Sequence, residues 1–476
     1  MKNYKKVYAA FILAGGLILH GCNGIFDDLA INPNQPSMGA YFTSPSAVND
    51  AVMTMYGYMS TQRCLGASGS KTTIIRSDEA SSNSDYGKPG MFGADLNASY
   101  YTIEQPYTLM YTTASQASYI IETAPSVDFS GNEELRNAYM GEAYFWRAFA
   151  HYYLLINFRN ISPIRQMPRN GDDYVRPLEK PAAVWNFIQE DLAHAKELLP
   201  VKGYWDSKNA GRVTKASAAA LLGKAYLYRS GIEQYYGEDK TTFYSEAAKE
   251  FGDVIDGKYG TYDLTKNYAD NFDVAHENNE ESILEFQFLG DVDNAGFNPG
   301  LATSGLAFDS RGLMLPGAGV GYEGVVHNWL YNAFVNSVDK DGYTDIRMFS
   351  TMIFNDLDAS IHLRNDAGGN PVRLEGPGGY KWEELYPAKN GKEGFATVSN
   401  PLAHSFKAGI RKGIDCSMPT QTEADGTPKL VGVGAGVKEY VYNQPRAHGV
   451  NWRYIRYADV LMMYAEAIVS GGKHQT

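Results

Sequence analysis

The chain has 476 residues, three cysteines and a formal net charge of −12. Its 42 basic and 54 acidic side chains make nucleic acids poor partners, because phosphate binding relies on clustered Lys and Arg. Three cysteines are too few for a disulfide scaffold, and 44% hydrophobic residues exclude a disordered chain. The 35 tyrosines outnumber the 21 phenylalanines and six tryptophans together. Tyrosine tolerates half-exposed positions, so these rings either pack in the core or form an aromatic surface.

The amino terminus has the pattern of a secretory signal. Lys2, Lys5 and Lys6 precede an apolar run over 7–19, which is too short for a membrane-spanning helix of about 20 residues. The run ends in Gly21-Cys22, which resembles the lipobox of bacterial lipoproteins, where the cysteine is acylated. An ordinary signal peptide with an incidental cysteine is the alternative. We predict a signal peptide over 1–21, lipidation at Cys22 and a tether over 22–43.

Amphipathic stripes follow the tether. Ser44-Pro45 has the pattern of a helix start, with a cap followed by proline, and apolar side chains recur at helical spacing from Val48 to Tyr56. Similar stripes run over 107–121 and 133–158. Glu142 falls on the apolar stripe of the last run, so we expect it to be buried with Arg136 or Arg147 as its partner.

Two further segments match a helical-hairpin repeat. Leu222-Gly223-x-x-Tyr226 and Ala247-x-x-x-Phe251 fit the tetratricopeptide pattern, with about a dozen extra residues in the turn between them. Ala183-x-x-x-Phe187 fits a second hairpin. An unrelated helical bundle with chance matches is the alternative. We predict a mainly α fold with a tetratricopeptide-like helical scaffold over 44–289.

The chain becomes rich in glycine after Gly290, and helical periodicity returns only at Tyr457–Val469. The stretch from Ser282 to Phe288 alternates like a strand. We therefore predict a large loop-rich insertion over 290–452, followed by a returning scaffold helix over 453–476. Loops carried by a rigid scaffold are where binding residues are commonly placed.

Several motifs that are typical of enzymes and cofactor sites are incomplete or absent in this sequence. Gly319-x-Gly321-x-x-Gly324 lacks the strand–turn–helix context of a dinucleotide site, and Asp291-x-Asp293 lacks later calcium ligands. There is no zinc-protease motif and no nucleophile elbow. We therefore predict no enzyme, no cofactor and no metal. Because acids are abundant, a glycoside hydrolase with a carboxylate pair stays open as a hypothesis from another functional class.

Several segments together resemble one family. They are Asp27-Asp28 behind the lipobox, Ser77-Asp78-Glu79, Gly141 to Ala148, Gly211 to Ala216, and Arg453 to Leu461 followed by Tyr464-Ala465-Glu466-Ala467. In this order they are similar to the SusD/RagB family, the outer-membrane nutrient-binding lipoproteins of Bacteroidetes. Family members continue past the last motif with another helical hairpin, so we expect the present sequence to be truncated after Thr476.

The resemblance implies a SusD-like α/α superhelix and a non-catalytic function. Such a protein is a lipid-anchored, surface-facing outer-membrane protein that captures oligosaccharide or polysaccharide for a SusC-like TonB-dependent transporter. Capture of peptides by the same architecture, as in the RagB branch, is the alternative. Aromatic faces stack on sugar rings, and polar side chains hydrogen-bond the hydroxyls.

Two regions supply candidate ligand-binding residues. One is the loop near 78–105, where the family often places an aromatic platform, and the other is the glycine-rich insertion. For each aromatic residue, core packing is the competing interpretation. The candidates are Asp78, Asp85, Tyr86, Tyr100, Tyr101, Phe297, Tyr322, Trp329, Trp382 and Tyr386.

Overall fold

The computed structural model describes a helical scaffold and a smaller second part. The described residues are 42–61, 63–65, 77–81, 98–167, 175–237, 241–272, 274–288, 325–354, 362, 408–410, 430–432, 438–440 and 451–473. Cys64 is buried and free, whereas Cys416 lies outside these residues.

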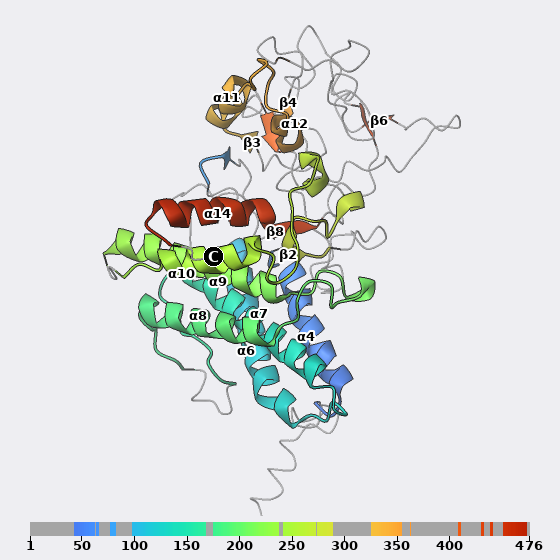
Figure 1. Ribbon diagram of the computed structural model, residues 1–476, viewed down its shortest axis with the longest axis vertical. Coiled ribbons are helices and arrows are strands. Elements are labelled where there is room, and N and C mark those ends of the chain that lie inside the picture. Colours follow the sequence, from blue (N-terminus) through green and yellow to red (C-terminus); the bar gives the residue numbers. More distant parts are fainter. Residues whose placement is uncertain are drawn as a thin grey trace, which may run out of the picture.

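The scaffold is a stack of helices that follow one another in chain order (Figure 1). Contacts join α4 to α6, α6 to α7, α7 to α8, α8 to α9, α9 to α10, and α10 to α14. This arrangement confirms the predicted mainly α, hairpin-based fold. The helices are α4 (Pro45–Ser60), α6 (Tyr101–Thr123), α7 (Glu133–Phe158), α8 (Pro181–Leu198), α9 (Lys215–Tyr236), α10 (Tyr244–Ile255) and α14 (Tyr457–Val469).

Local signals set the start and the buried face of α4. The Ser44 hydroxyl accepts a hydrogen bond from the Ala47 amide at 3.3 Å, and Pro45 occupies the first helical position. This arrangement satisfies an amide that would otherwise lack a partner. The predicted apolar side chains of Val48, Ala51, Val52 and Met55 are all buried, and they turn this face toward α6 and α7.

Glycine allows the two helices of the second hairpin to approach closely. A Cβ atom on Gly223 of α9 would lie 2.7 Å from Cε1 of Phe251 in α10. The repeat pattern predicted this pair of positions. The extra residues in the turn partly lengthen α9, which runs to Tyr236 and ends at Gly237 with φ +69°. Glycine adopts this left-handed conformation without steric cost.

The predicted partners of Glu142 were wrong. Its carboxylate pairs with Arg212, with Nη2–Oε2 at 2.6 Å and Nε–Oε1 at 2.8 Å. Arg147 instead pairs with Asp191 of α8, and Arg136 pairs with Glu133. Positions five or six apart on a helix point in different directions, so neither predicted arginine faces Glu142.

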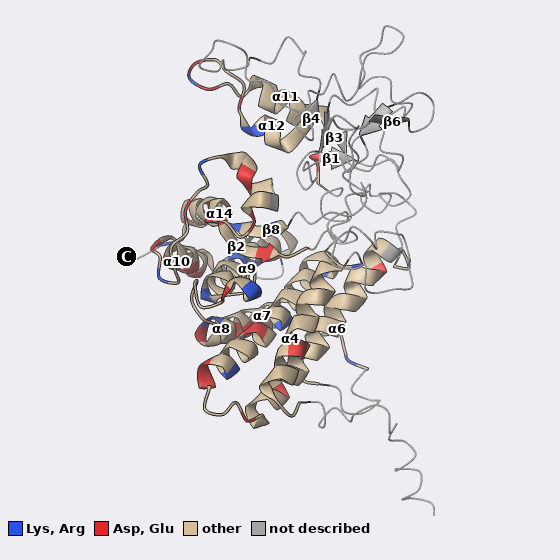
Figure 2. Cartoon of the chain, turned by 90° about the vertical axis from the view of Figure 1, so that its right-hand side faces the viewer, with Lys and Arg blue, Asp and Glu red and all other residues tan. Residues whose placement is uncertain are grey.

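The second part consists of short strands and two short helices, and it lies beyond α14 from the rest of the stack (Figure 2). A four-stranded antiparallel sheet has the order β1-β3-β5-β4. Val326, Tyr331, Met348 and Met352 form a small core against it. The elements are β1 (Ala80–Ser81), β3 (Val325–Val326), α11 (Asn328–Asn336), α12 (Arg347–Thr351), β4 (Met352–Phe354), β5 (Ala408–Ile410), and a hairpin of β6 (Leu430–Gly432) and β7 (Lys438–Tyr440).

The expectation that helix returns only at Tyr457 was therefore wrong for α11 and α12. Both are short, with nine and five residues. A helical stripe needs about 11 residues or more to be recognised from periodicity. In α11 only Tyr331 is fully buried, so no stripe could develop.

The segments that precede and follow the predicted insertion pair with each other as two strands of the scaffold. Strand β2 (Ser282–Phe286) pairs antiparallel with β8 (Trp452–Arg456), with Glu285 opposite Arg453 and Phe286 opposite Trp452. The predicted strand is confirmed over β2. The chain thus leaves the scaffold and returns to it at neighbouring positions, and α14 follows β8 directly.

Candidate functional site

The structure describes four of the ten predicted ligand-binding residues. They are Asp78, Tyr100, Tyr101 and Trp329, and Tyr101 is described only as the first residue of α6. The others, and the lipidation position, lie outside the described residues. These are Cys22, Asp85, Tyr86, Phe297, Tyr322, Trp382 and Tyr386.

Two predicted residues from distant regions lie together. The indole N–H of Trp329 donates to the backbone oxygen of Asp78 at 2.7 Å, across 251 positions of sequence. Strands β1 and β3 hold the two segments side by side, with Ala80 opposite Val326. The His327 amide donates to the Glu79 oxygen at 2.9 Å and extends this pairing. The two candidate regions thus meet at one site.

The site presents an aromatic ring whose orientation is fixed. Trp329 lies in the first turn of α11, immediately after β3, and its side chain is 49% exposed. Its polar N–H is already satisfied by the backbone, so the remaining exposed surface is largely apolar. Asp78 and Glu79 are exposed beside it, and their carboxylates are hydrogen-bond acceptors. Such a site suits a ligand with both apolar faces and hydroxyl groups.

Tyr100 has a defined structural position. It is the residue before α6, it is half-buried, and its backbone oxygen accepts from the amides of Ile103 and Glu104 at 2.8 Å each. Among the predicted residues that the structure describes, the hydrogen-bonded pair is Asp78 and Trp329. Glu79 and His327 are site residues that the prediction did not select. Glu79 belongs to the family-like segment Ser77-Asp78-Glu79, whereas the only sequence signal for His327 is its position two residues before Trp329.

The charged residues of the family-like motifs lie in the scaffold. The Glu142 carboxylate also accepts from the Tyr56 hydroxyl at 2.6 Å, and Arg212 stacks over Trp205 at 4.2 Å. Burial raises the pKa of Glu142 above its ordinary value, and hydrogen bonds from Arg212 oppose the shift. The Asp459 carboxylate accepts from the Arg456 amide at 2.8 Å at the start of α14. These groups therefore join helices and strands of the scaffold.

The described part of the chain has neither a metal-binding cluster nor a helix suited to span a membrane. No three His, Cys, Asp or Glu side chains there converge in a way that could hold a metal ion. None of the helices described there combines the length and the apolar character that crossing a membrane requires.

Comparisons with known proteins agree on one family. A family model described as "Starch-binding associating with outer membrane" matches residues 31–227. A SusD-like protein of Bacteroides ovatus is 26% identical over 293 residues, which are 61% of this chain and 51% of that protein. The chain thus spans about half the length of the curated relatives it matches.

Solved structures share the fold at low sequence identity. A SusD superfamily protein from Bacteroides vulgatus aligns with a TM-score of 0.62 and 21% identity, over 91% of this chain and 77% of that one. A structure described as a laminarin-binding SusD-like protein aligns with a TM-score of 0.60 and 21% identity, over 91% and 82% of the two chains. The description of the matching family names binding and not catalysis, in agreement with the prediction that the chain is not an enzyme. The family model and the curated relatives thus support a SusD-like family for this chain, and the solved structures share its fold.

Proposed function

We propose that this protein captures oligosaccharide at the cell surface and passes it to a SusC-like TonB-dependent outer-membrane transporter. The observation that carries the proposal is the Trp329 ring, which is held by the Asp78 backbone and half exposed, with the exposed residues Asp78 and Glu79 on the adjoining segment. An aromatic face packs against the C–H face of a pyranose, and the carboxylates accept hydrogen bonds from its hydroxyls. Capture and release need no bond cleavage, so no acid–base pair is required.

The ligand class is a neutral glycan. The formal net charge of −12 and the two exposed acids beside Trp329 disfavour polyanions. The relative described as laminarin-binding supports β-glucans as the first compounds to test. None of the relatives named above is described as binding peptides, so the peptide alternative has no support from them.

Isothermal titration calorimetry with laminari-, malto- and xyloglucan oligosaccharides tests this function. Trp329→Ala should weaken binding at least about tenfold, because a buried aromatic contact at an interface can contribute about 2 kcal/mol. Tyr235→Ala is the matched control, since this ring is 84% exposed near the end of α9, away from the site. Failure of every glycan to bind, or equal affinities of the two variants, would refute the proposal.

The remaining parts of the proposal concern the anchor and the segments. We propose acylation at Cys22, a tether over 22–43, a scaffold over 44–289 and a ligand-binding insertion over 290–452 with its returning helix. Cys22→Ala should move the protein from the outer-membrane fraction to the soluble periplasmic fraction, because several acyl chains are needed for stable anchoring. Co-purification with a TonB-dependent transporter from detergent extracts tests the partner. Membrane retention of the Cys22→Ala variant would exclude this anchor.

A further inference from the structure

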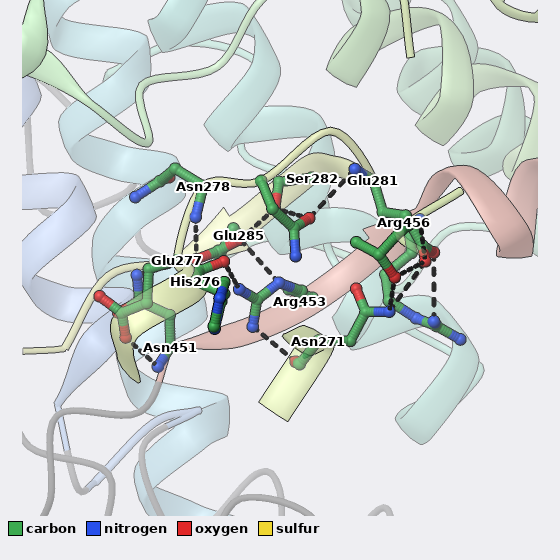
Figure 3. Close-up of polar contacts among 12 residues, drawn as sticks. Asn271, His276, Glu277, Asn278, Glu281, Ser282, Glu285, Asn451, Arg453 and Arg456 are labelled. Atoms are coloured by element: carbon green, nitrogen blue, oxygen red, sulfur yellow. Dashed lines mark hydrogen bonds and ion pairs between the residues drawn. The ribbon is translucent and has the colours of Figure 1, made fainter. Parts of the chain in front are cut away.

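A buried ion pair lies where the chain leaves the scaffold and returns to it (Figure 3). Arg453 Nε and Glu285 Oε2 are 3.2 Å apart, and the two side chains are 2% and 1% exposed. The Asn451 amide group donates to Glu285 Oε1 at 2.9 Å, and its oxygen accepts from the Phe288 amide at 2.7 Å. Strand β2 precedes and β8 follows the intervening 162 residues, 289–450. Glu285, Asn451 and Arg453 connect these two strands, and we call the three residues the clamp.

Arg453 also reaches beyond the two strands. Its Nη1 donates to the backbone oxygen of Asn271 at 2.5 Å, and its Nη2 donates to that of His276 at 2.6 Å. Asn271 lies in a short 3₁₀ helix, η5 (Tyr268–Phe272), and His276 ends another, η6 (Val274–His276). A guanidinium has enough donors, in a fixed fork, to serve both carbonyls while it faces Glu285.

The helix η5 connects the clamp to the second part of the molecule. It contacts α12, where Met348 is fully buried in the small core with Val326, Tyr331 and Met352. Tyr331 lies on α11, two positions after Trp329, and Val326 lies in β3 opposite Ala80. A continuous path of contacts therefore runs from Arg453 through η5 and α12 to the helix that carries Trp329.

We propose that Arg453 is a positioning residue for the site at Trp329. Its hydrogen bonds fix the position of η5, and the contact between η5 and α12 fixes the position of α12. The small core that α12 shares with α11 and β3 then sets the position of Trp329 relative to Asp78. Coupling between distant sites travels through such packed and hydrogen-bonded contacts. The effect on ligand rests on the proposed glycan function, whereas the effect on Trp329 itself does not.

Arg453→Lys tests the path. Lysine keeps the positive charge beside Glu285, but a single ammonium cannot reproduce the forked bonds to both carbonyls. Arg165→Lys is the matched control, because Arg165 makes a similar pair with Glu179 at 2.7 Å on the surface, with side chains 43% and 31% exposed. Indole N–H signals in a ¹⁵N–¹H NMR spectrum report on Trp452 beside the clamp and on Trp329 at the site, each assigned by a Trp→Phe substitution.

Arg453→Lys should shift both indole signals and weaken glycan binding about 2- to 30-fold, the range for mutations along coupling networks. Arg165→Lys should change neither. Met348→Ala, at the far end of the path, should shift the Trp329 signal and leave that of Trp452 in place.

A folded Arg453→Lys protein with an unchanged Trp329 signal would overturn the proposal, as would an unchanged signal in Met348→Ala. Simultaneous movement of all six indole signals would also overturn it, because it would show general loosening and not positioning. If the unmodified protein binds no glycan, the proposed function fails, and the NMR signals still decide the positioning.

Discussion

His151 is a buried histidine that should make the protein sensitive to mild acid. It lies in α7 with no exposed surface. Its Nε2 accepts from the Ile164 amide at 2.9 Å, so the ring proton is on Nδ1, which donates to the Arg147 oxygen at 2.8 Å. Burial lowers the pKa of His151 to about 3, and nearby arginines add to the shift. Protonation would place a second donor against the Ile164 amide.

The magnitude follows from the difference between the folded and unfolded pKa values. The unfolded histidine titrates near pH 6.5, so below that pH the unfolded chain binds a proton that the folded chain does not. Stability from this group is therefore intact above pH 6.5 and lost as the pH falls toward 3. At pH 5 the loss is about 1.5 × 1.36, or about 2 kcal/mol, and below pH 3 it approaches about 5 kcal/mol.

Urea unfolding at pH 7 and pH 5, for the unmodified protein and for His151→Gln, measures this effect. Glutamine can offer one acceptor and one donor but does not titrate. Between pH 7 and pH 5, the free energy of unfolding of the unmodified protein should fall by about 2 kcal/mol more than that of the variant. Both proteins have the same carboxylates, so the effect of their titration cancels in this difference. Equal losses would refute a neutral, buried His151.

Three other substitutions have expected outcomes of their own. Arg212→Met leaves a buried carboxylate without its partner and should lower the free energy of unfolding by about 3–5 kcal/mol in urea denaturation; a loss under about 1 kcal/mol would contradict the buried pair. Gly223→Ala forces a methyl group against Phe251 and should cost about 1–3 kcal/mol, whereas Gly231→Ala in the same helix, with open space around it, should be neutral or stabilising. Trp329→Phe keeps a ring but loses the N–H donor, so calorimetry should show glycan affinity reduced about 2- to 12-fold; a loss as large as that of Trp329→Ala would show that the ring face is not the contact.

Local patterns were sufficient to predict the long helices. The bounds of α7 and α14 match the predicted runs, and Ser44 caps α4 as its sequence indicates. These features depend on residues within a few positions of one another, which is why periodicity and capping reveal them. The helices α11 and α12 are too short to develop a periodic stripe, so the same analysis missed them.

Contacts between distant segments were not predictable from these patterns. Glu142 meets Arg212 across 70 positions, and Asp78 meets Trp329 across 251. Each pair depends on how whole elements pack, and many other arginines or aromatic rings satisfy the same local rule. The sequence could thus select Asp78 and Trp329 as candidates, but only the pairing of β1 with β3 brings them together.

The alanine-rich half of α9 shows why polar residues matter to this stack. The alanines at 216 and 218–220 are completely buried, and such small, similar side chains allow close approach but distinguish poorly between neighbouring registers. Further along α9, Arg229 donates to Asn186 and Gln189 of α8, and Glu233 accepts from Arg159 and Trp185. A shift of α9 by one residue along its neighbours would leave these buried charges without their partners. Breaking a buried ion pair in this way costs about 3–5 kcal/mol. Alanine sets the spacing between the helices, and the buried charges choose the register, so the residues that specify the stack are polar ones that hydrophobic periodicity does not select.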